Sequence, residues 1–430
     1  MTGKRGGRGG RRAPRARPTS RRSRPPSIDD MAGSIVRGGV ELLAIEDPLE
    51  AEAWASAMLG AFYKIDAPLE ARDELEVSLW PAVCAQAEVR GDRAGLAVLD
   101  VLGAVADDPL AARTRAAAGR LRAAGVVPPS WAGELGSVVF EGAWVMLDVF
   151  GDHEAWYATF RYPGRQAHLV NALYDKAMGE IIKDAFVGYA SENPRDLVAL
   201  EDGVSAVDAA PERMARRVID AIASGDLYLD NDWTPEFKRF RALLLARMRS
   251  LPISPAIDPP EPLGDDERDV LIGEFLASGS VAGDEEADII ASHCLDYLCD
   301  YLSDDPFRWS PIVVEQFLLD YLPRKVSLTM GQIRQLSRVL RAWVRFALTK
   351  RGLDERWIVE TEEAVDQFAA DFRRAATDAD EFGLAKTLGM AILADGIDPL
   401  DQAAVDRWIE EFNRRPLSER DRLLDRLTRS

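Results

Sequence analysis

The sequence predicts an α+β protein that is predominantly α-helical, with a small antiparallel β-meander at about residues 137–189 packed between helical regions. The first observation is turn chemistry: Gly151-Asp152 and Pro163-Gly164 separate apolar stretches of strand length. Glycine adopts the positive φ of tight hairpins, and proline fixes the first dihedral of a turn. The second observation is that apolar residues elsewhere recur every three or four positions, which is typical of amphipathic helices.

The chain begins with a segment of extreme charge. Residues 1–28 contain ten Lys and Arg and no acidic residue, so the remainder holds 43 basic against 72 acidic residues, a formal charge of −29. Residues 1–34 are therefore predicted to be a disordered basic tail. Arginine near a phosphate releases counterions, which makes residues 4–24 a candidate for weak nucleic-acid contact. Two other interpretations are together favoured: an extension without a dedicated partner, or a start of translation at Met31, where the composition becomes globular.

Residues 35–135 are predicted to form an N-terminal helical region. Asp47-Pro48 has the chemistry of a helix start, because aspartate accepts an unpaired N–H as N-cap and proline fits the first helical position. Other Asp-Pro pairs recur at irregular spacings, so they indicate helix starts and not a repeat. The expected helices, which are rich in alanine and leucine, cover residues 50–64, 68–90, 92–106 and 109–124.

Residues 136–250 are predicted to contain the meander and two further helices. The turn signals divide the meander into four strands of about nine residues, with Gly179 in a looser third connection. A sheet of this size is stable only when helices cover at least one face. We expect the two helices near residues 205–224 and 235–250.

A proline-rich linker and a second helical domain complete the chain. Residues 251–264 contain five prolines. Because proline removes backbone donors and disfavours helix, this segment is the expected domain boundary. Residues 265–430 are predicted to form a C-terminal helical domain, with the apolar helix that starts at Ser310-Pro311 and ends at Leu322-Pro323 in the centre of its core.

The composition indicates a globular protein of the cytoplasm. Hydrophobic residues make up 47% of the chain, which is enough for substantial cores. Cys84, Cys294 and Cys299 are too few for a disulfide framework and are expected to be reduced core residues. The sequence contains no run of 18 apolar residues, so no membrane span is predicted. A strongly acidic body repels nucleic acid and anionic membranes.

Two of the three histidines fall in the meander and make it the first candidate site. His153 follows the Gly-Asp turn and His168 lies in the third strand, with Asp148 and Asp184 in the same region. A histidine with carboxylates on neighbouring strands binds a metal or acts as a general base, which makes the segment a candidate for metal-assisted hydrolysis. No HExxH or CxxC motif accompanies them. His168 shares strand parity with Tyr174, on the face expected under the helices, and this favours a structural role.

The second candidate is the acidic face of a helix expected at residues 285–303. Asp296 and Asp300 follow His293 by three and seven residues, so the three side chains share one surface. Neighbouring carboxylates raise an imidazole pKa, so the face is a candidate for pH sensing or cation binding. An ordinary solvated face is the alternative, and the favoured one.

The third candidate is a row of arginines on the helix expected at residues 329–350. Arg334, Arg338, Arg341 and Arg345 recur at four, three and four residues, opposite the apolar face. If exposed and unpaired, such a row binds anions or docks a partner. In a strongly acidic body we expect it instead to pair with carboxylates of this chain or of another copy.

Several segments resemble a group of actinobacterial proteins for which no activity is established. The resemblance is carried by DVFGDHEAWYATFRYPGRQAHLVNALYD with EIIKDAFV, by FKRFRALLLARMRSLP, and by RWSPIVVEQFLLDYLPRK with LRAWVRF. It covers most of the chain after about residue 90 and excludes the basic tail. The resemblance implies that sheet, linker and C-terminal helices occur together as one architecture, and it transfers no catalytic or binding residue.

These patterns favour an interaction or regulatory protein without catalytic activity, which contacts protein partners through helical grooves and charged surfaces. Two alternatives stay open. One is a nucleic-acid-associated protein that uses the arginine-rich tail, and the other is a metal-assisted hydrolase sited on the meander. No cofactor is predicted.

Overall fold

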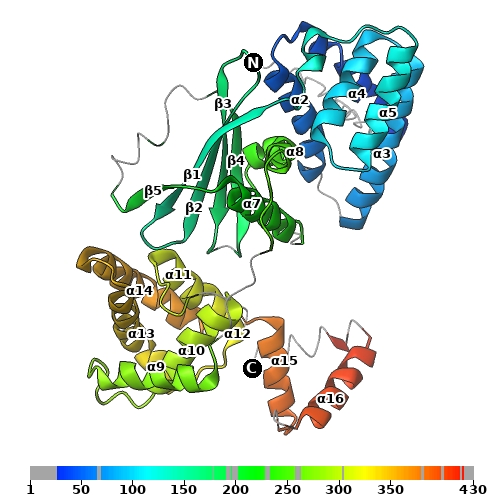
Figure 1. Cartoon of the computed structure of the whole chain (residues 1–430). Helices are drawn as coiled ribbons and strands as arrows, with labels where there is room; N and C mark the ends of the chain where they lie inside the picture. Colours follow the sequence, from blue (N-terminus) through cyan, green and yellow to red (C-terminus); the bar gives the residue numbers. More distant parts are fainter. Residues whose placement is uncertain are drawn as a thin grey trace, which may run out of the picture.

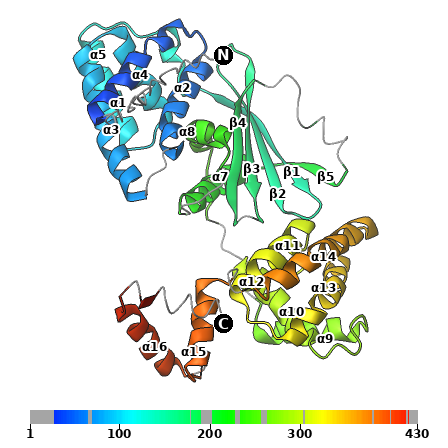
Figure 2. The same ribbon diagram turned by 180° about the vertical axis from the view of Figure 1, so that it is seen from behind.

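A computed structural model shows an α+β protein, mostly helical, built around a five-stranded antiparallel sheet (Figure 1). An N-terminal body, residues 28–251, contains the sheet, and a C-terminal body, residues 263–378, lies against one end of it in both views (Figures 1 and 2). The structure describes residues 27–64, 69–177, 179–189, 195, 202–227, 233–256, 263–302, 305–378, 382–398, 401–416 and 419–420.

The first helix begins earlier than the sequence predicts. In α1 (Ile28–Gly38) the hydroxyl of Ser27 accepts the N–H of Asp30, whose carboxylate in turn accepts the N–H of Ser27. This capping box satisfies two donors at the helix start. Residues 28–34, assigned to the disordered tail by the sequence prediction, therefore form helix, and Met31 lies within it. The arginines at 4–24 lie outside the described residues.

The other predicted helices of the N-terminal region are confirmed. They are α2 (Pro48–Gly60), α3 (Leu69–Arg90), α4 (Arg93–Val105) and α5 (Leu110–Ala123), with short 3-10 turns at Glu41–Ala44, Ala61–Lys64 and Ser130–Gly133. Asp47 caps α2 as predicted, with its carboxylate 3.0 Å from the N–H of Leu49. α4 is buried on nearly every side, because it is apolar all round and α2, α3 and α5 pack against it.

The four strands of the predicted meander are also confirmed. They are β1 (Val139–Asp148), β2 (His153–Arg161), β3 (Ala167–Asp175) and β4 (Ile181–Gly188), and each is antiparallel to the next. Gly151, Gly164 and Gly179 have φ values of 77°, 75° and 94°. These left-handed conformations explain why glycine stands at each of the three connections.

A fifth strand corrects the prediction of helix near 205–224. β5 (Val204–Asp208) pairs antiparallel with the free edge of β1, which gives the strand order β4-β3-β2-β1-β5. The helix α7 starts only at Pro211 and runs to Asp226. The five residues of β5 form their hydrogen bonds with a strand more than 50 residues earlier in the chain. The local sequence pattern therefore does not predict a strand here.

α7 and α8 (Pro235–Arg249) cover one face of the sheet (Figures 1 and 2). Trp156, Ala158 and Phe160 alternate along β2 and point toward these helices, as period-two burial requires. One hydrophobic core runs from Ala32 to Leu251 and includes the N-terminal helices, the sheet, α7 and α8. The regions predicted at 35–135 and 136–250 therefore form one body.

The C-terminal body is a helical bundle with its own core. Its elements are α9 (Asp265–Ala277), α10 (Ala287–Leu295), α11 (Pro311–Gln316), α12 (Leu322–Lys325), α13 (Met330–Arg351) and α14 (Glu355–Ala375), with π-helical turns at Asp296–Tyr301 and Phe317–Tyr321. Trp309, Phe317 and Trp343 are fully buried in its core. Pro323 does not end the helix there, contrary to prediction: the backbone stays helical from the π turn at Phe317–Tyr321 through Lys325.

The last two described helices form a separate small unit. α15 (Leu384–Ala394) and α16 (Gln402–Arg414) project from the bundle in both views. Their core consists of Ala391, Ile392, Trp408 and Phe412. The single domain predicted at 265–430 thus contains two hydrophobic cores.

The state of the cysteines and the length of the helices test two predictions, that of reduced core cysteines and that of no membrane span. Cys84, Cys294 and Cys299 are free and buried, as expected. Within the described part of the chain, none of the helices has the length and apolar character needed to cross a bilayer.

Candidate functional site

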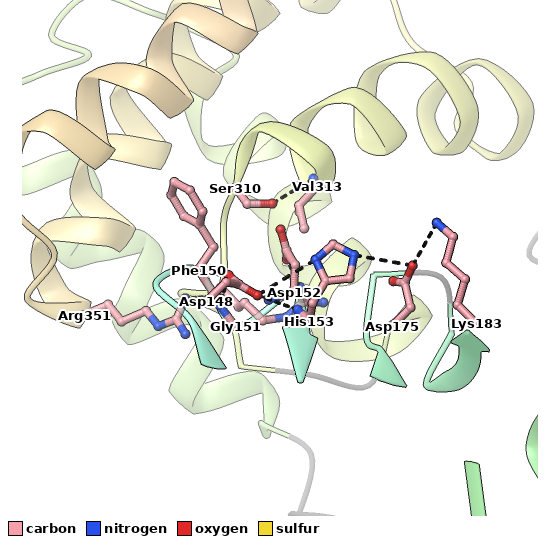
Figure 3. Close-up of polar contacts among 11 residues, drawn as sticks. Asp148, Phe150, Gly151, Asp152, His153, Asp175, Lys183, Ser310, Val313 and Arg351 are labelled. Atoms are coloured by element: carbon pink, nitrogen blue, oxygen red, sulfur yellow. Dashed lines mark hydrogen bonds and ion pairs between the residues drawn. The ribbon is translucent and has the colours of Figure 1, made fainter. Parts of the chain in front are cut away.

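The turn between β1 and β2 reaches the C-terminal body and is held in shape by Asp148 (Figure 3). One carboxylate oxygen of Asp148 accepts the N–H groups of Phe150 and Gly151, each at 2.8 Å. The other oxygen accepts the N–H of His153 at 2.5 Å. Asp148, a candidate metal ligand by sequence, therefore organises the hairpin through backbone contacts.

Asp152, at the tip of this turn, forms an ion pair with the C-terminal body. Its carboxylate accepts a hydrogen bond of 2.6 Å from Nη1 of Arg308. The side chains of Arg308 and Asp152 are 2% and 4% exposed, so the pair is enclosed by protein. Burial raises the pKa of Asp152, while a hydrogen bond from Ser310 and the charge of Arg308 lower it. Ser310 also caps α11 by accepting the N–H of Val313.

His153 lies between carboxylates of neighbouring strands (Figure 3). Its Nε2 is 3.5 Å from Oδ2 of Asp175, and its Nδ1 is 3.9 Å from Oδ2 of Asp148. Asp175 is directly opposite His153 in the register of β2 and β3 and also receives Lys183 of β4 at 3.4 Å. The hydrogen bond to Asp175 and the nearby carboxylates raise the pKa of His153, against the opposing effect of burial.

Further contacts tie the same turn to α13 and α14. Nη1 of Arg351 donates to the carbonyl of Phe150 at 2.5 Å. The ring of Phe150 packs edge-on against Trp357, with centroids 5.8 Å apart. Trp357 also lies so close to Gly203 that a Cβ there would be 2.7 Å from the indole. We call this set of contacts, formed by the β1–β2 turn with Arg308, Arg351 and Trp357, the interbody joint.

The carboxylates around His153 favour the protonated imidazole. Three carboxylates, Asp148, Asp152 and Asp175, face two permanent cations, Lys183 and Arg308. Chemically, the imidazole with Asp175 can act as a general base, and the whole cluster can act as a pH-dependent lock between the bodies.

We expect the interbody joint to weaken as pH rises. The folded-state pKa of His153 is raised above its ordinary value of 6.5. Its stabilising contribution is therefore fully present below about 6.5 and is lost as pH rises through the raised value. His153→Gln should remove this part of the pH dependence, measured as the difference between urea-unfolding midpoints of wild type and variant across pH 5 to 9.

The midpoint of the variant must be subtracted from that of wild type at each pH, because His168 affects stability in the opposite direction to His153. Burial, helped by Arg247, lowers the pKa of His168 to about 3, so the folded state loses stability below about 6.5, where the unfolded imidazole binds a proton. His293→Gln is the matched control, since His293 is a half-buried histidine beside a carboxylate, Asp296, on α10 of the C-terminal body and outside the joint. A pH profile of His153→Gln that runs parallel to wild type would contradict the prediction.

His168 and Asp184, the other sheet candidates, serve separate structural roles. His168 is buried on the helix-covered face, as strand parity predicts, and its Nε2 accepts Nε–H of Arg247 at 3.1 Å. Arg247 also donates to Glu52 at 2.6 Å and to Tyr162 at 2.7 Å. Asp184 accepts the hydroxyl of Thr234 at 2.5 Å.

Each of these contacts attaches a helix to the sheet. Thr234 is the N-cap of α8 and accepts the N–H of Phe237, so Asp184 positions the start of that helix. Glu52 lies on α2 and Arg247 on α8, so their pair joins both helices to β3 through His168. Within the described residues, no contact joins His168 or Asp184 to His153.

The acidic face of α10 and the π turn after it is paired with an arginine of α9. Arg268 forms a bidentate contact with Asp300 and lies 3.4 Å from Asp296. His293 approaches Asp296 at 3.7 Å. The hydrogen bond from Arg268 lowers the pKa of Asp300. The three sequence candidates thus lie together, and one cation of the protein, Arg268, contacts both carboxylates.

Most of the arginine row on α13 is paired within the chain. Arg345 donates to Glu362 at 2.7 Å and to Glu355 at 2.8 Å, and Arg341 reaches Glu362 and Asp366. Arg338 pairs with Asp284. Arg334 is exposed and has no charge partner among the described residues. Three arginines of the row therefore connect α13 to α14 and to Asp284 by ion pairs.

No described set of residues converges as a metal site. Among the described residues, no group of three or more His, Cys, Asp or Glu side chains is arranged to hold a metal ion. No protein-family model, curated protein or solved structure matches this chain.

Sequence reasoning missed the residues that carry the buried charges. Arg308 and Arg247 are among the largest fully buried side chains, and their partners Asp152 and Glu52 are 3% and 1% exposed. The available signal was weak: each arginine is set in an apolar stretch, FRW for Arg308 and LARM for Arg247. Such a pattern does not distinguish a buried guanidinium from one at the edge of a helix face.

Proposed function

We propose that this protein is a cytoplasmic interaction or regulatory protein without catalytic activity, whose two bodies present one continuous surface to a protein partner. The observation that carries the proposal is the Asp152–Arg308 pair, in which two almost completely buried charges come from different bodies. A buried ion pair is favourable only when its geometry is maintained. It therefore supports a fixed orientation of the bodies, which a partner that contacts both of them requires.

Charge and cysteine chemistry support the same proposal. The chain beyond residue 28 carries a formal charge of −29, so complementarity favours a partner with a basic surface. The acidic face after α10 pairs with Arg268 of α9, and the arginines of α13 pair mainly with carboxylates of α14, so these charges are largely satisfied within the C-terminal body. Three free, buried cysteines are typical of a reducing compartment.

The test is affinity capture of the tagged full-length protein from its native host, quantified by mass spectrometry at low and high salt. We expect a basic protein to be retained in stoichiometric amount by wild type and by the control Arg324→Ala, which removes the exposed pair of Arg324 on α12 with Asp320 of the preceding π turn. Arg308→Ala should retain several-fold less. Equal retention by Arg308→Ala, or the absence of any stoichiometric protein, would contradict the proposal.

A hydrolase sited on the sheet is the second candidate. The observation that favours it is the His153–Asp175 pair, whose imidazole is one-third exposed while the carboxylate is 2% exposed. A carboxylate behind a histidine orients the ring for proton transfer. Metal analysis of the purified protein, together with ester and phosphoester hydrolysis by wild type and His153→Gln, tests it. Turnover that the variant abolishes would favour this candidate over the first.

A further inference from the structure

The N-terminal body contains a cleft of about 550 Å³ that none of the predicted sites includes. Its walls come from the end of α2, from α3, from the connection between α4 and α5, and from α8. In Figures 1 and 2 these helices lie on the side of the sheet opposite β5. Ligand sites in proteins typically enclose about 300–1,000 Å³, so the volume suits a medium-sized organic molecule.

The back of the cleft is rigid. Gly60 of α2 faces α8 so closely that a Cβ there would lie 1.8 Å from the carbonyl oxygen of Lys238. Beside it, the hydroxyl of Ser56 donates to the carbonyl of Arg239 at 2.7 Å and accepts the N–H of Leu243 at 3.1 Å. A close, hydrogen-bonded helix pair holds its shape before a ligand arrives, which reduces the ordering cost of binding.

The lining is mainly apolar and aromatic. Trp80 and Leu245 are buried, with 4% and 5% of their surface exposed, and Leu59 and Pro81 lie beside them. Tyr63 packs edge-on against Trp233, with ring centroids 5.3 Å apart. Such walls bind an apolar or aromatic body by removing it from water.

The acids at the cleft already have cationic or other partners. Asp108 pairs with Arg115 at 3.3 Å, Asp107 pairs with Arg249, and Glu76 has an interaction of its own. The charged side chain at the cleft that has no described partner is a cation. Arg113 lines the cleft, is exposed, and has no charge partner among the described residues.

A second guanidinium, that of Arg241, also lines the cleft. Arg241 lies over the ring of Tyr63 at 4.9 Å and pairs with Asp226 through Nη2. Its Nε–H is buried and has no acceptor among the described residues. Because this atom has no accessible surface, a ligand in the cleft does not reach it, and Arg113 is the guanidinium that such a ligand meets. A planar carboxylate suits guanidinium donors better than any neutral group does.

We propose that this cleft binds a small organic acid with an aromatic or branched apolar body, whose carboxylate is held by Arg113. The apolar body lies against Trp80, Leu59 and Leu245. Binding of this ligand is a function additional to the proposed partner interaction, because the cleft and the interbody joint share no residue.

The test uses 1-naphthaleneacetate and its neutral analogue 1-naphthaleneacetamide as probes, with isothermal titration calorimetry on the full-length protein. We expect the acid to bind about tenfold more tightly than the amide, the value of one charge-assisted hydrogen bond. Arg113→Gln should weaken acid binding about five- to tenfold and leave amide binding unchanged. The matched control Arg120→Gln removes an exposed arginine of the same helix that does not line the cleft, and should change neither.

A blocking variant separates the cleft from other surfaces. Ala242→Phe places a ring in the cleft from α8 and should abolish binding of both probes, with an unchanged circular dichroism spectrum as the check on folding. Equal affinities for acid and amide, equal losses in Arg113→Gln and Arg120→Gln, or no binding at millimolar probe would overturn the proposal. Any of these results would leave the partner-capture experiment unaffected, because that experiment depends on the joint.

Discussion

Replacing Arg308 by alanine is expected to destabilise the folded protein by about 3–5 kcal/mol, the cost of leaving one charge of a buried pair without its partner. Asp152 would remain 3% exposed beneath α11 with its main cationic neighbour removed. The carboxylate then either takes up a proton or opens the contact to water. We therefore expect a lower urea midpoint and a larger radius of gyration by small-angle X-ray scattering, as the two bodies separate.

Two variants make this prediction specific. The double variant Asp152→Asn with Arg308→Met removes both charges and should recover most of the lost stability, because an apolar pair of similar size avoids the desolvation of two ions. Arg324→Ala breaks an exposed pair with Asp320 and should cost less than about 1 kcal/mol. A single variant Arg308→Ala that is as stable and compact as Arg324→Ala would show that the joint does not hold the bodies together.

Replacing Arg247 by alanine should have an effect of similar size, about 3–5 kcal/mol, within the N-terminal body. Its guanidinium is 2% exposed and donates to Glu52, Tyr162 and His168 at once. Removal leaves the carboxylate of Glu52 buried beside a tyrosine, whose pKa burial already raises. Because Glu52 belongs to α2 and Arg247 to α8, we expect both helices to lose protection in hydrogen–deuterium exchange.

Single substitutions of the other residues in this network should lower stability in proportion to the buried charge that they leave without a partner. Tyr162→Phe removes one neutral hydroxyl and should cost about 1–3 kcal/mol. Glu52→Ala leaves the buried guanidinium of Arg247 without its carboxylate, so its loss of stability should be close to that of Arg247→Ala. Arg216→Ala on α7, whose pair with Asp220 is partly exposed, is the matched control. Exchange of α2 and α8 at wild-type rates in Arg247→Ala would contradict the assigned role.

The joint and the cleft lead to different expectations for function. Arg308→Ala tests whether the fixed orientation of the bodies matters to a partner. If the partner is basic, the difference in partner retention between wild type and Arg308→Ala should disappear at high salt. Arg113→Gln tests recognition of a carboxylate and leaves the joint intact. A protein that retained its partner but bound no organic acid would keep the first role and lose the second.

The sequence determined the local structure because local chemistry is sufficient for it. Glycine at positive φ defined the three connections of the meander, and Asp47 with Pro48 defined the start of α2. Strand parity placed His168 under the helices. The proline-rich segment predicted a boundary at 251–264, and the two large hydrophobic cores lie on either side of it. The strongly acidic composition indicated that the arginine row on α13 pairs with carboxylates of the chain.

Only the tertiary structure decided which distant groups meet. β5 exists because the edge of β1 was free to pair with it, and its five residues have no periodicity that distinguishes strand from helix. Asp152 and Arg308 are 156 residues apart, and Glu52 and Arg247 are 195 residues apart. The energy of such contacts depends on burial and on distances between side chains, quantities that arise only when the chain has folded. Capping and turn preferences, by contrast, act between neighbours in sequence and are present before it folds.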